Sequence, residues 1–200
     1  MKRVLKSSLA MLLVAVLMFS LVACGENRNS PEGVLKSALN ELKAGNFEKA
    51  EEYFLNPDRT MLKRAGMESI GDSISIIFKE IEYEIISKEN VDENTVNITV
   101  EITTTDMTPV FNDLFSGIME YAMTVISSGV EPTEEEITQK VSEIFVECAS
   151  KPDLAKTTSE VVVKAVKFED TWKLEADEAF FDAISGELSK AIASMTTIFE

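Results

Sequence analysis

The chain has 200 residues, of which 45% are hydrophobic and 27% charged, and this composition is typical of a globular domain. The formal net charge of −16 argues against binding nucleic acid through a basic patch. The sequence contains no histidine, which excludes Ser-His-Asp and Cys-His catalysis and removes the commonest metal ligand. Acid–base chemistry would have to use Asp, Glu, Lys or Tyr. We therefore expect no cofactor and no metal site, and a non-enzymatic protein is favoured while an enzyme remains open.

The first 23 residues have the layout of a secretory signal. Three basic residues, Lys2, Arg3 and Lys6, precede an apolar run over residues 9–23. A transmembrane helix needs about 20 apolar residues, so this run is short for a span. We interpret residues 1–23 as a signal peptide.

The run ends in Leu21-Val22-Ala23-Cys24, which resembles a bacterial lipobox. The resemblance implies cleavage between Ala23 and Cys24 and attachment of lipid, including palmitate, to the Cys24 thiol. The protein would then be anchored on the extracytoplasmic face of the cell membrane. Residues 24–30 would form a lipidated tether and residues 31–200 a single domain. Loss of the signal peptide would leave 177 residues with a net charge of −19.

Two helices are predicted at the start of the domain. Ser30 is a good N-cap, Pro31 suits the first helical position, and apolar residues then repeat at helical spacing as far as Gly45. A second short helix covers residues 47–54 and ends before Asn56-Pro57-Asp58. Residues 58–79 favour helix in pieces.

Four strands are predicted after the first helices. Residues 81–86 and 95–103 alternate between apolar and polar side chains, which indicates an antiparallel pair with one wet face. Residues 160–168 are apolar at both parities, so we expect a central strand that is covered on both faces. A tight turn at Glu169-Asp170 leads to a fourth strand over 172–176.

A helical pair lies between the two strand pairs, within residues 106–152. Its first helix starts at Thr108-Pro109 and is interpreted as a core helix rather than a membrane span, since acidic residues interrupt its apolar face. The second helix begins with a capping box at Thr133. Its apolar face carries Cys148, which we expect to be a buried small hydrophobic residue rather than a reactive thiol. Asp177 is expected to cap one last helix.

These elements predict an α+β fold. N-terminal helices pack on a curved, mainly antiparallel four-stranded sheet, cone-like in shape, with an inserted helical pair and a C-terminal helix. The stretch around Lys43-Ala44-Gly45-Asn46-Phe47 and the closing Trp172-Lys173-Leu174 resemble the nuclear-transport-factor-2-like, or cystatin-like, domains in lipoproteins of unknown function from Gram-positive bacteria. The resemblance covers residues 30–188. The chain departs from it by the insertion at 106–152 and by Glu169-Asp170-Thr171 where an Asp-Gly turn is more usual.

The resemblance does not supply a function, because this fold hosts enzymes and binding modules alike. It implies an apolar cavity inside the cone, and the aromatic candidates to line it are Tyr53, Phe54, Tyr83 and Trp172. Plain core packing is the alternative for all four residues. We expect a non-enzymatic envelope lipoprotein that binds a protein or a small apolar ligand. The alternatives are an extracytoplasmic enzyme that uses Asp or Glu with Tyr, and a structural subunit of a membrane-associated complex.

Overall fold

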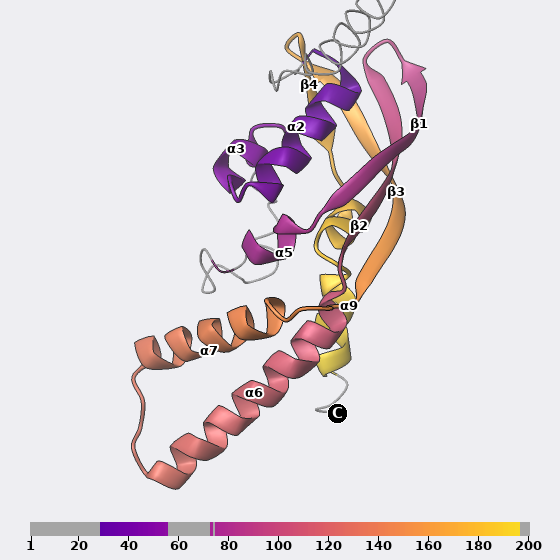
Figure 1. The fold of residues 1–200 in the computed structure, drawn as a ribbon. Helices are drawn as coiled ribbons and strands as arrows, with labels where there is room; N and C mark the ends of the chain where they lie inside the picture. Colours follow the sequence, from indigo (N-terminus) through magenta and orange to yellow (C-terminus); the bar gives the residue numbers. More distant parts are fainter. Residues whose placement is uncertain (1–28, 56–72, 74, 197–200) are drawn as a thin grey trace, which may run out of the picture.

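The computed structural model describes residues 29–55, 73 and 75–196. The predicted signal peptide, Cys24, residues 25–28 of the tether and the helical pieces expected over 58–72 lie outside the described residues. The described chain is elongated, with a sheet and its helices at one end and a projecting helical hairpin at the other (Figure 1). The expected α+β class is confirmed.

The four strands form one antiparallel sheet in chain order. They are β1 (Glu82–Asp92), β2 (Thr95–Thr105), β3 (Lys156–Phe168) and β4 (Thr171–Glu175). β3 and β4 are joined at Glu169 and Asp170, whose φ angles are 46° and 65°. Two successive positive φ angles match the twist of a two-residue hairpin turn. Glu169 and Asp170 therefore adopt the left-handed conformation at turn positions where glycine or asparagine is usual.

The inner face of the sheet carries the core. Alternate residues of β2 are buried there, namely Val96, Ile98, Val100 and Ile102. α2 (Pro31–Lys43) packs across β2, β3 and β4, and α8 (Glu178–Ile184) packs on β2 and β3. The short helices α3 (Phe47–Glu51) and α5 (Ser75–Lys79) pack beside α2 on the same side (Figure 1). Ser30 caps α2 through a 3.1 Å bond from the Gly33 amide, as predicted.

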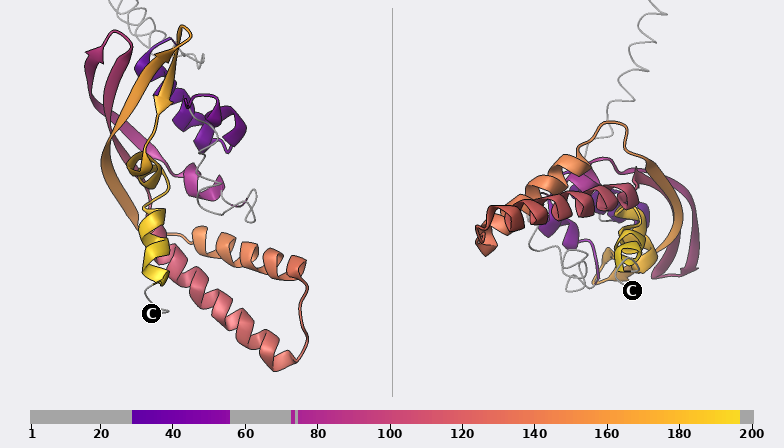
Figure 2. Two further views of the ribbon diagram at one scale, coloured as in Figure 1. Left: turned by 180° about the vertical axis from the view of Figure 1, so that it is seen from behind. Right: turned by 90° about the horizontal axis from the view of Figure 1, so that it is seen from below.

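The outer face of the sheet is open to solvent (Figure 2). Val162 on β3 is 54% exposed, and its outward neighbour Lys164 pairs with Glu175 on β4 at 2.8 Å. The prediction that residues 160–168 are covered on both faces is therefore wrong. Valine fits a pleated surface whether or not it is buried, so an outward valine imitates the pattern of a central strand.

The inserted helices do not cover the sheet. α6 (Met107–Ser128) and α7 (Glu134–Ala149) leave the end of β2 and project from it as a hairpin (Figure 1). Only the first two turns of α6 are buried, at Met107, Val110, Phe111 and Leu114. The interpretation of this helix as a core helix holds for those turns and is wrong for the outer part. No helix in the described ranges is long and apolar enough to cross a membrane.

The C-terminal helix is divided in two, unlike the single helix expected. α8 ends at Ile184, and α9 (Leu188–Thr196) follows and packs along α6. Gly186, at the corner, has a φ of 67° and its carbonyl accepts a 2.9 Å bond from the Met107 amide. A Cβ at this position would lie 1.8 Å from the carbonyl oxygen of Thr105. The corner is thus fitted against the junction of β2 and α6, and only glycine leaves room for it.

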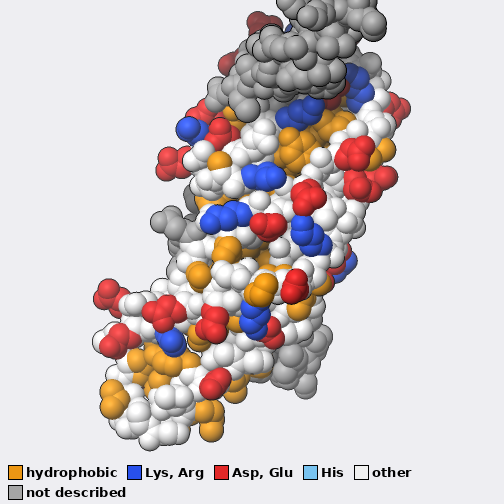
Figure 3. Space-filling view, viewed as in Figure 1, with side chains coloured by type: hydrophobic (Ala, Val, Ile, Leu, Met, Phe, Trp, Pro, Cys, Tyr) orange, Lys and Arg blue, Asp and Glu red, His pale blue; other side chains and the backbone are white. Residues whose placement is uncertain are grey.

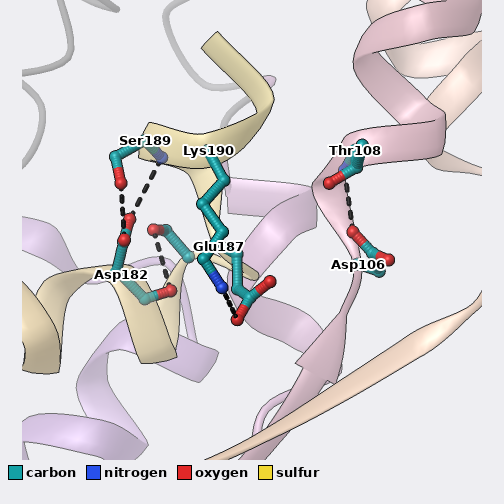
Figure 4. A network of polar contacts seen from close by, with 7 residues as sticks. Asp106, Thr108, Asp182, Glu187, Ser189 and Lys190 are labelled. Atoms are coloured by element: carbon teal, nitrogen blue, oxygen red, sulfur yellow. Dashed lines mark hydrogen bonds and ion pairs between the residues drawn. The ribbon is translucent and has the colours of Figure 1, made fainter. Parts of the chain in front are cut away.

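Polar contacts hold the same corner (Figure 4). The Asp182 carboxylate accepts from the Ser189 amide at 3.0 Å and from its hydroxyl, which ties the end of α8 to the start of α9. Lys190 pairs with Glu187 at 2.6 Å. Asp106 caps α6 by accepting from the Thr108 amide at 2.8 Å. The bond from the Met107 amide to the Gly186 carbonyl and the packing of α9 along α6 join this corner to the start of α6.

The two edges of the sheet differ in how they end. At β4, the Leu174 amide donates to the Tyr53 carbonyl at 2.8 Å and the Leu55 amide donates to the Leu174 carbonyl at 2.9 Å. β1 has register shifts between Ile85 and Ser87 and again near its end, where β-bulges interrupt the pairing with β2.

Candidate functional site

The four aromatic candidates all border the core. Tyr53 is 1% exposed, and Phe54 packs against Phe180 and Phe181 with ring centroids 6.2 and 6.1 Å away. Tyr83 and Trp172 are half-buried and lie against the same core cluster. Burial raises the pKa of the Tyr83 hydroxyl, which disfavours Tyr83 as a base.

The sheet does not bring these four residues into one cavity. Tyr83 lies opposite Ile102, which faces Ser159 on β3, whereas Trp172 lies opposite Lys167 of the same strand. Eight residues of β3 separate these two levels, which is about 26 Å along a strand. Tyr83 and Trp172 are also on opposite edge strands. The two cannot line a common pocket for a small ligand.

A groove lies between α6 and α7, at the border of the core, because Cys148 of the core cluster is among the residues that line it. It encloses about 530 Å³ and is lined by both helices. The lining residues are Asp113, Ser116, Gly117, Glu120, Tyr121, Thr124, Lys140, Ile144, Glu147, Cys148 and Lys151.

The two helices meet at Gly117 on α6. A Cβ at this position would lie 2.6 Å from Cγ2 of Ile144 on α7. Glycine therefore allows a close approach of the two helices at this point, and both Gly117 and Ile144 line the groove. Lys151, after the end of α7, pairs with Asp113 of α6 at 2.8 Å and links the helices again.

The side chains of the groove suit binding better than reaction. Cys148 is 6% exposed, and burial raises the pKa of its thiol, so little of the reactive thiolate is present. This agrees with the expectation of a buried, inert cysteine. Within residues 29–55, 73 and 75–196, no three acidic or cysteine side chains are grouped as a metal site would require. The groove offers hydroxyls, carboxylates and two lysines.

The outer end of the same hairpin exposes apolar side chains. We call this surface the hairpin tip and define it as Met119, Met123, Ile126, Val130 and Ile137, which are 43–73% exposed. Figure 3 shows apolar side chains gathered over this end of the molecule, with acidic groups beside them. Sequence periodicity missed the surface because α6 has two apolar faces, and the pattern does not say which one is buried.

Comparison with known proteins shows a distant structural similarity. No family model matches the chain, and no curated protein matches it. The crystal structure of the putative lipoprotein ycdA from Bacillus subtilis is similar at 17% sequence identity with a TM-score of 0.42. The alignment covers 76% of this chain and 46% of the Bacillus chain, so the match spans less than half of that protein. At this score the likeness supports no conclusion about fold or function.

Proposed function

We propose that the protein is a lipoprotein, anchored through Cys24 on the extracytoplasmic face of the cell membrane, that acts as a non-enzymatic protein-binding module of the envelope. The observation that carries the anchor is Leu21-Val22-Ala23-Cys24, placed directly after a basic start and an apolar run. Buried acyl chain contributes about 0.8 kcal/mol per CH₂, so one chain holds weakly and two or three hold firmly.

The chain provides its own control for the anchor, because it contains one other cysteine. We expect Cys24→Ala to abolish incorporation of labelled fatty acid and to shift the protein out of the membrane fraction. Cys148→Ala should leave both unchanged, since Cys148 is buried in the domain. A Cys24→Ala protein that still carries label would refute the anchor.

The binding role is favoured over catalysis by the groups available. The buried cysteine has a raised pKa, and the groove's Lys151 is paired with Asp113, so neither is set up as a nucleophile or a base. A protein partner is favoured over a small apolar ligand for a different reason. The inner face of the sheet is occupied by α2, α5 and α8, whereas the apolar side chains of the hairpin tip face solvent.

Mass spectrometry separates these forms of the proposal. Native spectra of the mature protein should show the mass of the protein and its lipid alone, and crosslinking in intact cells should add a protein partner. A co-purifying small apolar molecule would instead support the ligand-binding form. Turnover of an envelope substrate that is lost on one Asp or Glu substitution would replace binding with catalysis.

A further inference from the structure

We propose that the hairpin tip docks a helix of a partner protein, and that the apolar stripe of that helix is flanked by lysine or arginine. The inference rests on the proposed binding function and specifies its surface and the chemistry of its partner.

The spacing of the tip residues suits a helical partner. Met119, Met123 and Ile126 follow one another at four and three residues, and Val130 comes just after the helix ends at Ser128. The spacing of Met119, Met123 and Ile126 places their side chains on one face of α6, as in the seam between two packed helices. The stripe is a second apolar face of α6, because the helix meets α7 elsewhere, at Gly117.

The exposure of the stripe sets it apart from ordinary surface residues. Ile126 is 73% exposed, Val130 69% and Met123 59%, and all three belong to the last turns of α6 or to the residues directly after it. Single exposed apolar residues are normal, but a group of them on a projecting element marks an interaction surface. Methionine adapts its shape to a partner, which suits such a surface.

The charge around the tip selects the partner. Residues 107–149 contain eight acidic residues and one lysine, and that lysine pairs with Glu143. Glu131, Glu134 and Glu135 are exposed beside the tip. Opposite charge on a partner would steer it to this end of the molecule and fix its orientation. Like charge disfavours both a second copy of this chain and an anionic lipid surface.

The position of the tip agrees with a partner outside the membrane. α2, which follows the tether, begins at the end of the molecule that lies opposite the hairpin (Figure 1). α6 has 22 residues and so extends about 33 Å from the end of β2. A lipid on Cys24 would hold the other end of the molecule, and the tip would face away from the bilayer.

Two synthetic helical peptides test the chemistry. Both carry the same leucine and isoleucine stripe, and one is flanked by lysine while the other is flanked by glutamate. The probes are titrated against the full lipidated protein in phosphatidylcholine nanodiscs at physiological salt. We expect the lysine peptide to bind at least about tenfold more tightly. Ile126→Glu should abolish this binding, and Val162→Glu, on the outer face of the sheet, should leave it unchanged. Equal binding of the two peptides, or equal effects of the two substitutions, overturns the proposal.

Photo-crosslinking in the producing cells tests the partner. A benzophenone side chain is placed at Ile126, with Val162 as the exposed control position. We expect an adduct at position 126 alone, joined to a protein segment with an apolar stripe and basic flanks. An adduct with a second copy, with lipid, or identical adducts at both positions overturns the inference. If position 126 yields nothing while another surface captures a protein, the tip is wrong and the binding function stands. If no position captures a protein, the binding function fails as well.

Discussion

Gly186 provides the sharpest test of how the hairpin is fixed to the sheet, and Gly129 provides its control. Both glycines have left-handed φ angles, 67° and 66°. A Cβ at Gly186 meets the Thr105 carbonyl oxygen at 1.8 Å, whereas a Cβ at Gly129 meets nothing within 4 Å. Alanine should therefore pay the same free-energy cost for the left-handed backbone at both positions, but it should meet a steric clash only at Gly186.

The expected losses of stability follow from those two costs. A left-handed alanine costs roughly 1–2 kcal/mol, and the lower entropy of the unfolded chain returns about 0.4–1 kcal/mol. Gly129→Ala should therefore lower the free energy of unfolding by about 0–1.6 kcal/mol. Gly186→Ala adds an overpacking cost of about 1–3 kcal/mol, because a backbone oxygen cannot rotate away. We expect a total of about 1–4.6 kcal/mol for Gly186→Ala.

Thermal and urea unfolding of residues 25–200, followed by circular dichroism, measure the difference. For a domain of this size, 1 kcal/mol corresponds to about 2–4 °C, so Gly186→Ala should lower the Tm by roughly 2–18 °C. Gly129→Ala should lower it by a few degrees at most. If the two variants lose equal stability, the contact between the corner and β2 does not hold α6 in place, and the reasoning fails.

Three further predictions concern the hairpin, one ion pair and the thiol. Gly117→Ala should destabilise the protein, because the new Cβ meets the Ile144 side chain. In an Ile144→Ala background the same substitution should be neutral or should stabilise the protein by about 1 kcal/mol, since alanine favours helix over glycine. A double-mutant cycle that shows no coupling between the two positions would contradict the contact. The Lys88 ammonium bonded to Glu32 holds the pKa of that carboxyl below 4.5. The stability that this ion pair gives the folded protein is therefore present above about pH 4.5, and it is lost as the pH falls through the lowered pKa. An NMR titration should show the pKa of Glu32 rising in Lys88→Met, and an unchanged value would exclude the pair in solution. Cys148 should react with a thiol reagent at pH 8 much more slowly in the native than in the unfolded protein, and equal rates would show an accessible thiol.

Local patterns predicted the sheet and most helix starts because they report direct physical constraints. The alternation along β2 reflects one buried face, and the caps at Ser30, Thr133 and Asp177 satisfy amides at helix starts. These features depend on neighbours a few residues away, which the sequence displays. The class of fold followed from their order.

Longer-range features were not available to the same reasoning. The division of the last helix at Gly186 depends on the Thr105 carbonyl, some 80 residues earlier in the chain. The separation of Tyr83 from Trp172 depends on the register of β3 against both its neighbours. The direction of α6 decides which of its apolar faces is exposed, and that direction is set by a corner which no local pattern reveals.

The two edges of the sheet affect whether copies of this molecule can add strands to one another. A long edge strand invites a neighbouring molecule to add its own strand. Here the β4 edge is already bonded to Tyr53 and Leu55. On β1, bulges break the regular ladder, and Glu82, Glu84 and Glu89 are exposed charges along it. Edges of this kind disfavour the addition of a strand from a second copy, and so disfavour growth into fibrils.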